Sequence, residues 1–224
     1  MIPWKHLDTA IVPDQGGELR LMQRGHEFSI MAGAIELMNS RLSGSEEALA
    51  TLTCERLGGR AKPTVLIGGL GMGFTLRAAL GAWGADAKMT VAELVPSVVA
   101  WARGPLAGVF DGCLDDPRVS IHVGDVCDPI REGKGAWDAI LLDVDNGPDG
   151  LTREANDGLY SPAGLDVART ALRPGGILAV WSSAPDDAFT RRLKRAGFQV
   201  EEVRVRASRT GRGAKHMIWL ARRP

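Results

Sequence analysis

A glycine-rich segment gives the first chemical signal in this sequence. The stretch VLIGGLGMGF places Gly69, Gly71 and Gly73 directly after a short apolar run and before a helical pattern. Glycine lets the chain turn with positive φ and lets a ligand approach the backbone closely, and the helix start presents free N–H groups. Nicotinamide-binding loops need the spacing G-x-G-x-x-G, whereas this loop reads G-x-G-x-G. The spacing weakens a pyrophosphate site, and a tight turn that binds nothing is the alternative.

Acidic residues follow the next three apolar runs. Glu93 ends the run MTVAE, where a carboxylate can accept hydrogen bonds from both hydroxyls of a ribose. Asp125 follows VSIHV, where it can accept a hydrogen bond from an adenine amino group, and Asp143 and Asp145 follow WDAILL. Any one of them is compatible with a solvated turn or a helix cap. Ligands of open α/β sheets bind outside the carboxyl ends of the strands. The glycine loop and the acidic residues at the ends of the next three strands therefore together predict a nucleoside site.

Alternating strand and helix patterns begin at Pro63 and would position these residues. We expect strands at 64–67, 89–93, 119–123, 137–142 and 176–181, and helices near 73–83, 96–103, 161–172 and 185–196. Strands separated by helices imply parallel pairing with right-handed crossovers. The segments FQVEEVRVRA and KHMIWLARRP flank a Gly/Arg turn and predict a final antiparallel hairpin. The predicted fold class is α/β, with a Rossmann-like, mostly parallel seven-stranded sheet closed by that hairpin.

The N-terminal part of the chain has a different pattern. ELRLMQR alternates apolar and polar residues with period two, which is typical of a half-buried strand. A Gly25-His26 turn and a second arm, EFSIMAGAIELMNS, complete a predicted hairpin over 18–39. We therefore divide the chain into an N-terminal β-hairpin module, 1–42, and a cofactor-binding domain, 43–224.

Composition narrows the classes of partner. The 27 basic and 27 acidic residues give a formal net charge of zero, which favours a small-molecule partner over nucleic acid or a membrane surface. The three cysteines show no CxxC or Cys/His spacing, so we predict neither a metal site nor disulfides. A reducing, cytoplasmic setting fits best. The first residues do not resemble a signal peptide, and no run approaches the roughly 18 apolar residues that span a bilayer.

With these residues in view, the chain resembles the class I S-adenosylmethionine-dependent transferases. Within that class it is most similar to the spermidine synthase (polyamine aminopropyltransferase) family. The matching segments are VLIGGLGMG for the cofactor loop, AELVPSVV for the ribose, HVGDVCDPI for the adenine, WDAILLDVD for the catalytic aspartate and LYSPAGLDVARTALRPGGILAVW downstream. The resemblance covers most of the chain. It implies S-adenosylmethionine, or its decarboxylated form, as the cofactor.

The resemblance and the strand tips together assign roles to single residues. Cofactor-binding roles fall on Gly69, Gly71, Gly73, Glu93, Asp125 and Asp143. Asp143 would be the acid/base aspartate near the transferred group, and Asp145 would be a second catalytic residue that holds a cationic acceptor. Glu36, Tyr160 and Trp181 are the further substrate-binding candidates, Trp181 because it ends a strand at the expected ligand edge.

Several polyamine-binding positions of the family differ here. The aspartate expected in the glycine loop, where it holds the propylamine cation, is Gly71, and the second acidic residue of the ribose segment is Val95. The glutamine expected after the hairpin glycine is Glu36, and the expected tyrosine-histidine pair is Ser45-Glu46. Adenosine contacts are kept while polyamine contacts are mostly lost. We therefore expect methyl transfer from S-adenosylmethionine to a small-molecule acceptor, with aminopropyl transfer from the decarboxylated donor as the alternative.

Interpretations from other classes stay open. The pocket could belong to a non-catalytic nucleoside-binding protein. The stretch RVRASRTGRGAK could serve an RNA methyltransferase, although a solvated hairpin turn is the simpler explanation because the net charge is zero. Asp143 and Asp145 alone do not define a magnesium site. We expect a homodimer, because an exposed N-terminal hairpin in this type of family usually pairs across a dimer.

Overall fold

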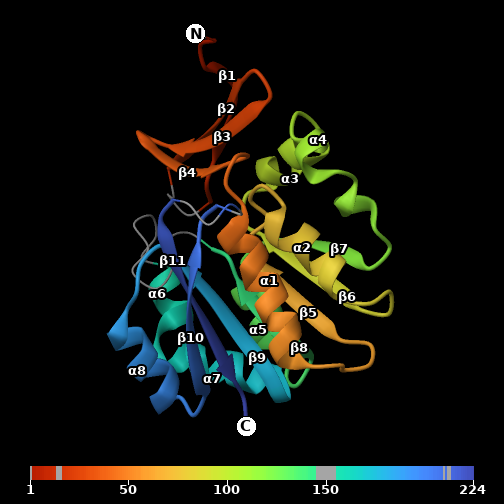
Figure 1. Ribbon diagram of the computed structural model, residues 1–224, viewed down its shortest axis with the longest axis vertical. Coiled ribbons are helices and arrows are strands. Elements are labelled where there is room, and N and C mark those ends of the chain that lie inside the picture. The colour runs from red at the N-terminus through yellow and green to blue at the C-terminus, as the bar shows by residue number, and fades with distance from the viewer. Residues whose placement is uncertain (1, 14–16, 145–154, 209, 211–212) are drawn as a thin grey trace.

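The chain forms two β-sheets and a set of flanking helices (Figure 1). The computed structural model describes residues 2–13, 17–144, 155–208, 210 and 213–224. The N-terminal sheet is antiparallel in the order β1-β2-β3-β4. Its strands are β1 (Lys5–Ile11), β2 (Glu18–Arg24), β3 (Glu27–Ala32) and β4 (Ile35–Asn39). The sequence predicted only the central hairpin, whose Gly25-His26 turn lies between β2 and β3 as expected.

The main sheet has the order β10-β11-β9-β8-β5-β6-β7. Its strands are β5 (Thr64–Gly68), β6 (Lys88–Glu93), β7 (Val119–Val123), β8 (Trp137–Leu142), β9 (Leu172–Ser182), β10 (Gln199–Arg206) and β11 (Lys215–Arg222). Strands β7, β6, β5, β8 and β9 are neighbours in this order, and each of these neighbouring pairs is parallel. Strand β11 runs antiparallel to both β9 and β10. The predicted α/β class and the C-terminal hairpin are therefore confirmed.

Helices cover both faces of the main sheet (Figure 1). One face packs against α1 (Gly44–Leu57), α2 (Phe74–Ala82) and α3 (Pro96–Arg103), and the other against α5 (Cys127–Glu132), α7 (Pro162–Ala171) and α8 (Asp187–Arg195). The short helices are α4 (Ala107–Phe110), α6 (Ala155–Tyr160) and a 3₁₀ turn at Cys113–Asp115. Strand β8 is buried along its whole length. Ala139 and Leu141 face the first set of helices, whereas Ile140 and Leu142 face the second, so both faces of this strand demand apolar side chains.

The N-terminal sheet shares a core with the main sheet. Leu19, Leu21 and Ile30 belong to the same buried cluster as Ile67 of β5 and Leu49 of α1. The N-terminal sheet therefore lies against the edge of the main sheet where the parallel strands have their carboxyl ends. Figure 1 shows it at the top of the molecule. The division of the chain at residue 42 and the expected homodimer stay predictions.

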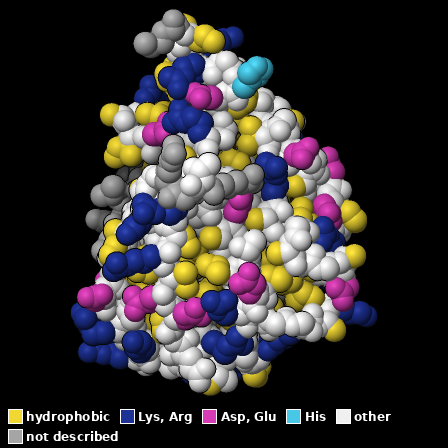
Figure 2. Space-filling model, in the orientation of Figure 1, with side chains coloured by type: hydrophobic (Ala, Val, Ile, Leu, Met, Phe, Trp, Pro, Cys, Tyr) yellow, Lys and Arg dark blue, Asp and Glu magenta, His cyan; other side chains and the backbone are white. Residues whose placement is uncertain are grey.

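The described surface mixes both signs of charge. Figure 2 shows basic and acidic side chains interspersed over one face of the molecule. Of the basic stretch noted in the sequence, Arg209 and Arg212 lie outside the described residues. None of the described helices combines the length and the apolar character needed to cross a bilayer.

A buried ion-pair cluster holds the amino-terminal edge of the main sheet. Asp138 is 2% exposed. Its carboxylate accepts hydrogen bonds from Arg60 Nη1 at 2.5 Å, from Arg173 Nη1 at 2.5 Å and from the backbone N–H of Thr64 at 2.8 Å. One carboxylate therefore joins the start of β5, the start of β8 and the start of β9.

Replacement of this carboxylate should destabilise the fold. We expect Asp138→Ala to lower the free energy of unfolding by about 2 kcal/mol, because it leaves the Arg60 and Arg173 guanidiniums and the N–H of Thr64 without their shared acceptor. Urea denaturation followed by circular dichroism measures the change. The control is Asp115→Ala, which removes a carboxylate that is 80% exposed and bonded to Arg103; it should stay within about 0.5 kcal/mol of wild type. Equal values for the two variants would show that the buried cluster adds no stability.

Candidate functional site

The glycine loop between β5 and α2 has a backbone that only glycine fits at two positions. Gly69 has φ +89°, and a Cβ there would collide with the carbonyl oxygen of Asp143. Gly73 has φ +77°, and a Cβ there would lie 2.6 Å from the ring of Phe110. The loop therefore passes directly against the tip of β8 before it enters α2.

Glu93 fastens this loop to the end of β6. Its side chain is 7% exposed. Oε2 accepts a hydrogen bond from the backbone N–H of Leu70 at 3.0 Å, and Oε1 accepts one from the N–H of Val95 at 2.8 Å. The carboxylate thus has a structural role in shaping the loop in addition to its predicted role toward a ribose.

Asp125 lies just beyond the tip of β7, two residues before α5 begins. Its Oδ1 accepts a hydrogen bond from the backbone N–H of Cys127 at 2.8 Å. Burial, with the Asp125 charge as a smaller cause, raises the pKa of the Cys127 thiol to about 12. The thiol is therefore protonated at neutral pH and has no nucleophilic character.

A cavity of about 140 Å³ lies between the strand tips and the N-terminal sheet. The tips contribute Gly69, Gly71, Glu93, Asp125 and Asp143. The N-terminal sheet and its flanks contribute Val12, Leu19, Ala32, Leu37 and Met38, and further apolar walls come from Leu94, Val95, Val98 and Val126. We call this the nucleoside cavity. Carboxylates at one edge and apolar side chains on both walls suit a flat base joined to a ribose.

Five of the six predicted cofactor residues therefore line one cavity, and the sixth, Gly73, lies behind them against Phe110. Their assigned roles toward a cofactor stay predictions. The sequence did not predict the roof of this cavity, which the apolar residues of the N-terminal sheet provide.

A second cavity of about 70 Å³ adjoins the first. The two share the lining residues Leu37, Met38, Gly71 and Asp143. The second also contains Asn39, Glu46, Leu70, Met72, Phe74 and Trp181. We call it the acidic cavity, because the carboxyl groups of Glu46 and Asp143 both face it.

Asp143 has the most perturbed acid–base behaviour at the site. Burial and the neighbouring charge of Glu46 raise the pKa of Asp143 to about 7, although a hydrogen bond from Thr75 Oγ1 to its Oδ2, 2.5 Å long, acts in the opposite direction. Burial also raises the pKa of Glu46. Asp143 is therefore able to exchange a proton near neutral pH, as a general base must.

Trp181 belongs to the wall of the acidic cavity. It is 9% exposed, and its ring packs edge to face on His216 with 4.8 Å between the ring centroids. Its indole N–H has no hydrogen-bond partner among the described residues. A buried donor without a partner fits a ligand or water in the cavity.

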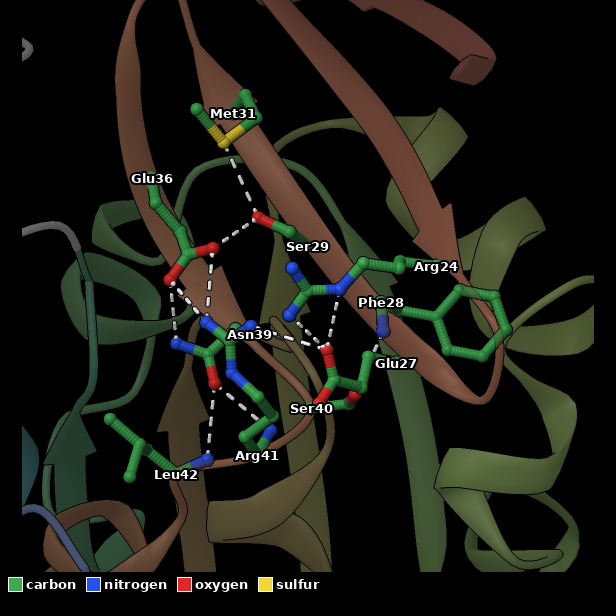
Figure 3. Close-up of polar contacts among 10 residues, drawn as sticks. All are labelled: Arg24, Glu27, Phe28, Ser29, Met31, Glu36, Asn39, Ser40, Arg41 and Leu42. Carbon is green, nitrogen blue, oxygen red and sulfur yellow. Dashed lines mark hydrogen bonds and ion pairs between the residues drawn. The ribbon is translucent and has the colours of Figure 1, made fainter. Parts of the chain in front are cut away.

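Glu36 lies in a polar network on the N-terminal sheet (Figure 3). Its Oε2 accepts a hydrogen bond from Ser29 Oγ at 2.8 Å, and its Oε1 accepts bonds from Asn39 Nδ2 at 2.9 Å and Arg41 Nη2 at 3.1 Å. Glu36 lines neither of the two cavities. The predicted contact of Glu36 with a substrate stays a prediction.

Tyr160 and Asp145 complete the predicted site residues. Tyr160 is 1% exposed and packs edge to face on Phe189 in the core beneath the main sheet, with 5.5 Å between the centroids. It lines neither cavity. Asp145 lies outside the described residues. The roles of both residues stay predictions.

Glu46 and Thr75 are the residues of this site to which sequence reasoning gave no role. Glu46 stands in the first turn of α1, and Thr75 in the first turn of α2. No local pattern links them to Asp143, which follows 97 positions after Glu46. Among the described residues, no three His, Cys, Asp or Glu side chains gather in a way that would hold a metal ion.

Comparison of the sequence with known proteins found polyamine aminopropyltransferases. Polyamine aminopropyltransferase 1 of Streptomyces coelicolor is 32% identical over 149 residues, which are 63% of this chain and 27% of the relative. The polyamine aminopropyltransferase of Mycobacterium tuberculosis is 32% identical over 151 residues, or 63% of this chain and 28% of the relative. The chain thus spans little more than a quarter of the length of these relatives. No protein-family model matches the chain.

Comparison of the structure found spermidine synthases and, at a lower TM-score, a methyltransferase. The spermidine synthase of Thermotoga maritima has a TM-score of 0.75 at 18% identity, covering 98% of this chain and 73% of the other. A methyltransferase of Burkholderia thailandensis, solved with 1,6-didemethyltoxoflavin and S-adenosylhomocysteine, has a TM-score of 0.56 at 18% identity, covering 81% of this chain and 79% of the other. At such identities these likenesses concern the fold. The chain is thus a sequence relative of the polyamine aminopropyltransferases over 63% of its length and has the fold of the Thermotoga maritima spermidine synthase.

Proposed function

We propose that this chain transfers the aminopropyl group of decarboxylated S-adenosylmethionine to an amine. The observation that carries the proposal is the charge of the two cavities. Four carboxyl groups line them, those of Glu46, Glu93, Asp125 and Asp143, and none of their described lining residues is Lys, Arg or His. A donor with a sulfonium and an ammonium but no carboxylate suits such a site better than intact S-adenosylmethionine, whose carboxylate would face like charges.

The geometry suggests how the donor would be divided between the cavities. Glu93 and Asp125 in the nucleoside cavity offer carboxylate oxygens to ribose hydroxyls and to an adenine amino group. Gly71 and Asp143 line both cavities. The reacting carbon would therefore lie near these two residues, with the tail of the donor and the acceptor in the acidic cavity.

Glu46 changes the ranking that the sequence suggested. The sequence favoured methyl transfer because Gly71 stands where the family has an aspartate for the propylamine cation. In the structure, Glu46 and Gly71 line the same small cavity. The carboxylate missing from the loop has a counterpart in the same cavity, which supports aminopropyl transfer.

The chain's own residues account for alignment and proton removal. A sulfonium needs no activation, so catalysis rests on placing the acceptor nitrogen in line with the carbon–sulfur bond. The acceptor must attack as a neutral amine. Asp143, with a pKa of about 7, is suited to take its proton.

Methyl transfer is the second candidate, and one observation favours it. The positive-φ backbone at Gly71 carries no acid and no bulky side chain at the boundary of the two cavities. Such a position leaves room for the carboxylate of intact S-adenosylmethionine beside the N–H groups of the loop.

A comparison of donors distinguishes the two candidates. We expect the decarboxylated donor to bind about 10-fold more tightly than S-adenosylmethionine in isothermal titration calorimetry, a difference of about 1.4 kcal/mol. With amine acceptors, mass spectrometry should detect an aminopropylated product together with methylthioadenosine. Tighter binding of intact S-adenosylmethionine and accumulation of S-adenosylhomocysteine would instead identify a methyltransferase.

The nucleoside cavity can be tested with a ligand common to both candidates. We expect Glu93→Ala to weaken methylthioadenosine binding at least about 10-fold, because it removes the acceptor of the ribose hydroxyls and of two backbone N–H groups. Calorimetry measures the affinity. Glu18→Ala, an exposed position at the start of β2, is the control and should bind like wild type. Unchanged affinity in the Glu93 variant would place the nucleoside elsewhere.

The pH dependence of transfer should report Asp143. Only the ionised carboxylate accepts a proton, so kcat/KM, which reports the ligand-free enzyme, should rise with pH up to the pKa of Asp143, about 7, and level off above it. Glu46→Gln removes the neighbouring charge that raises this pKa. The rising limb should then move to lower pH. Glu55→Gln, at a 63% exposed carboxylate near the end of the same helix, is the matched control; an identical shift there would contradict the assignment.

A further inference from the structure

Three side chains form a hydrogen-bonded row that leads away from the acidic cavity. Ser45 Oγ donates to Oε2 of Glu46 at 2.7 Å. Ser45 Oγ also lies 2.8 Å from Nδ1 of His216 on β11. Ser45 is completely buried, whereas His216 is half-buried. The row thus connects a carboxyl group in the cavity with an imidazole that solvent can reach.

The row has two states that differ in the direction of its hydrogen bonds. Ser45 has one hydroxyl proton. When Glu46 is ionised, this proton points to Glu46, so Nδ1 of His216 must donate to Ser45. When Glu46 is protonated, it donates to Ser45, and the hydroxyl can donate in turn to an unprotonated Nδ1. From this second state Glu46 can pass its proton to Ser45 while Ser45 passes its own proton to Nδ1 of His216, and the imidazolium then releases the proton on Nε2 to solvent. This leaves the row in its first state. His216 must exchange its Nδ1 proton with solvent before the next transfer.

His216 is held ready for this exchange. Its ring packs at 78° against that of Trp181, which also lines the acidic cavity. Burial lowers the pKa of His216, so the neutral imidazole prevails at neutral pH. The other ionisable groups that act on the row are Asp143 and Glu47, which both face Glu46.

The proposed transfer needs such an exit. An acceptor ammonium loses one proton to become the attacking amine. Its lone pair forms the new carbon–nitrogen bond while the carbon–sulfur bond breaks and its electron pair stays on sulfur as a neutral thioether. One proton is therefore released in each turnover, inside a cavity of about 70 Å³ with two carboxyl groups and mostly apolar walls.

We propose that this proton leaves the acidic cavity from Glu46 through Ser45 to His216. The proposal rests on the proposed group transfer, and it makes Ser45 and His216 positioning residues that act through Glu46. Neither residue needs to touch a substrate. The proton would reach Glu46 directly from the acceptor or from Asp143, which faces the same cavity.

The tautomer of His216 tests the row independently of turnover. In a pH series on the full chain, ¹⁵N NMR should find the neutral ring of His216 protonated at Nδ1 once Glu46 is ionised. In Ser45→Ala this preference should disappear, because the acceptor of that N–H is gone. A ring protonated at Nε2 in the wild-type protein would overturn the proposal.

Kinetics test the use of the row. We expect His216→Gln to lower kcat about 10-fold, to leave the KM of donor and acceptor unchanged and to enlarge the solvent deuterium isotope effect. Added imidazole should restore part of the rate. His26→Gln, in the exposed turn between β2 and β3, should behave like wild type.

The outcomes separate this proposal from the proposed function. Transfer at the wild-type rate with an unchanged isotope effect in His216→Gln would overturn the proton exit and leave the transferase activity intact. Absence of any transfer by the wild-type chain, from either donor to a panel of amines, would overturn the proposed function, while the tautomer would still report whether the row exists.

Discussion

Two carboxyl groups that share a buried cavity set the electrostatics of this site. Burial disfavours the ionised form of Asp143, and the charge of Glu46 disfavours it further. At neutral pH a large fraction of Asp143 side chains is therefore protonated. A cation in the cavity would favour ionisation of both groups, so cation binding and proton loss are thermodynamically coupled. The site is built to respond to a positively charged ligand, and apolar walls make that response stronger than it would be in water.

Three elements must meet for this pair to exist. Asp143 follows β8, Glu46 starts α1, and Thr75 in α2 donates a hydrogen bond to Asp143 while its hydroxyl lies 3.3 Å from the backbone oxygen of Glu46. Helix α1 is fixed at its start by the hydrogen bond from Gly44 N–H to the carbonyl of Ala207 at 2.8 Å. On the other side, the glycine loop is held by Glu93. Hydrogen bonds and packing thus fix the start of α1 and the glycine loop, the two backbone segments beside the acidic cavity.

The sequence predicted the strands of the main sheet and the site residues at their carboxyl ends. Strands 119–123 and 137–142 have the bounds expected, and the glycine loop and three acidic tips line one cavity as their positions at the carboxyl edge implied. Strand β1 escaped prediction, and β4 was merged with β3 into the second arm of the predicted hairpin. Most of the side chains in β1 and β4 are exposed or half-exposed, and irregular register interrupts their pairing. Alternation is too weak a signal in such edge strands.

The site itself was less predictable than the fold. The resemblance assigned substrate roles to Glu36, where the family has a glutamine, and to Tyr160; neither residue lines a cavity, and both roles stay predictions. It gave no role to Glu46, which stands where the family has a histidine. Only the packing of α1 against β8 and β9 reveals that a residue in the first turn of a helix faces the tip of a distant strand.

The position of the second carboxylate changes what it can do. An acid at Gly71 would stand on a backbone with φ +50° and would approach the sulfur of Met38, 3.1 Å from a Cβ at that position. Glu46 reaches the same cavity from a helix, where its carboxylate has a fixed partner in Ser45. A loop acid offers charge alone, whereas this helical acid offers charge and a hydrogen-bonded route to His216. Under the proposed function, a carboxylate on the helix would combine recognition of a cation and removal of its proton in one side chain.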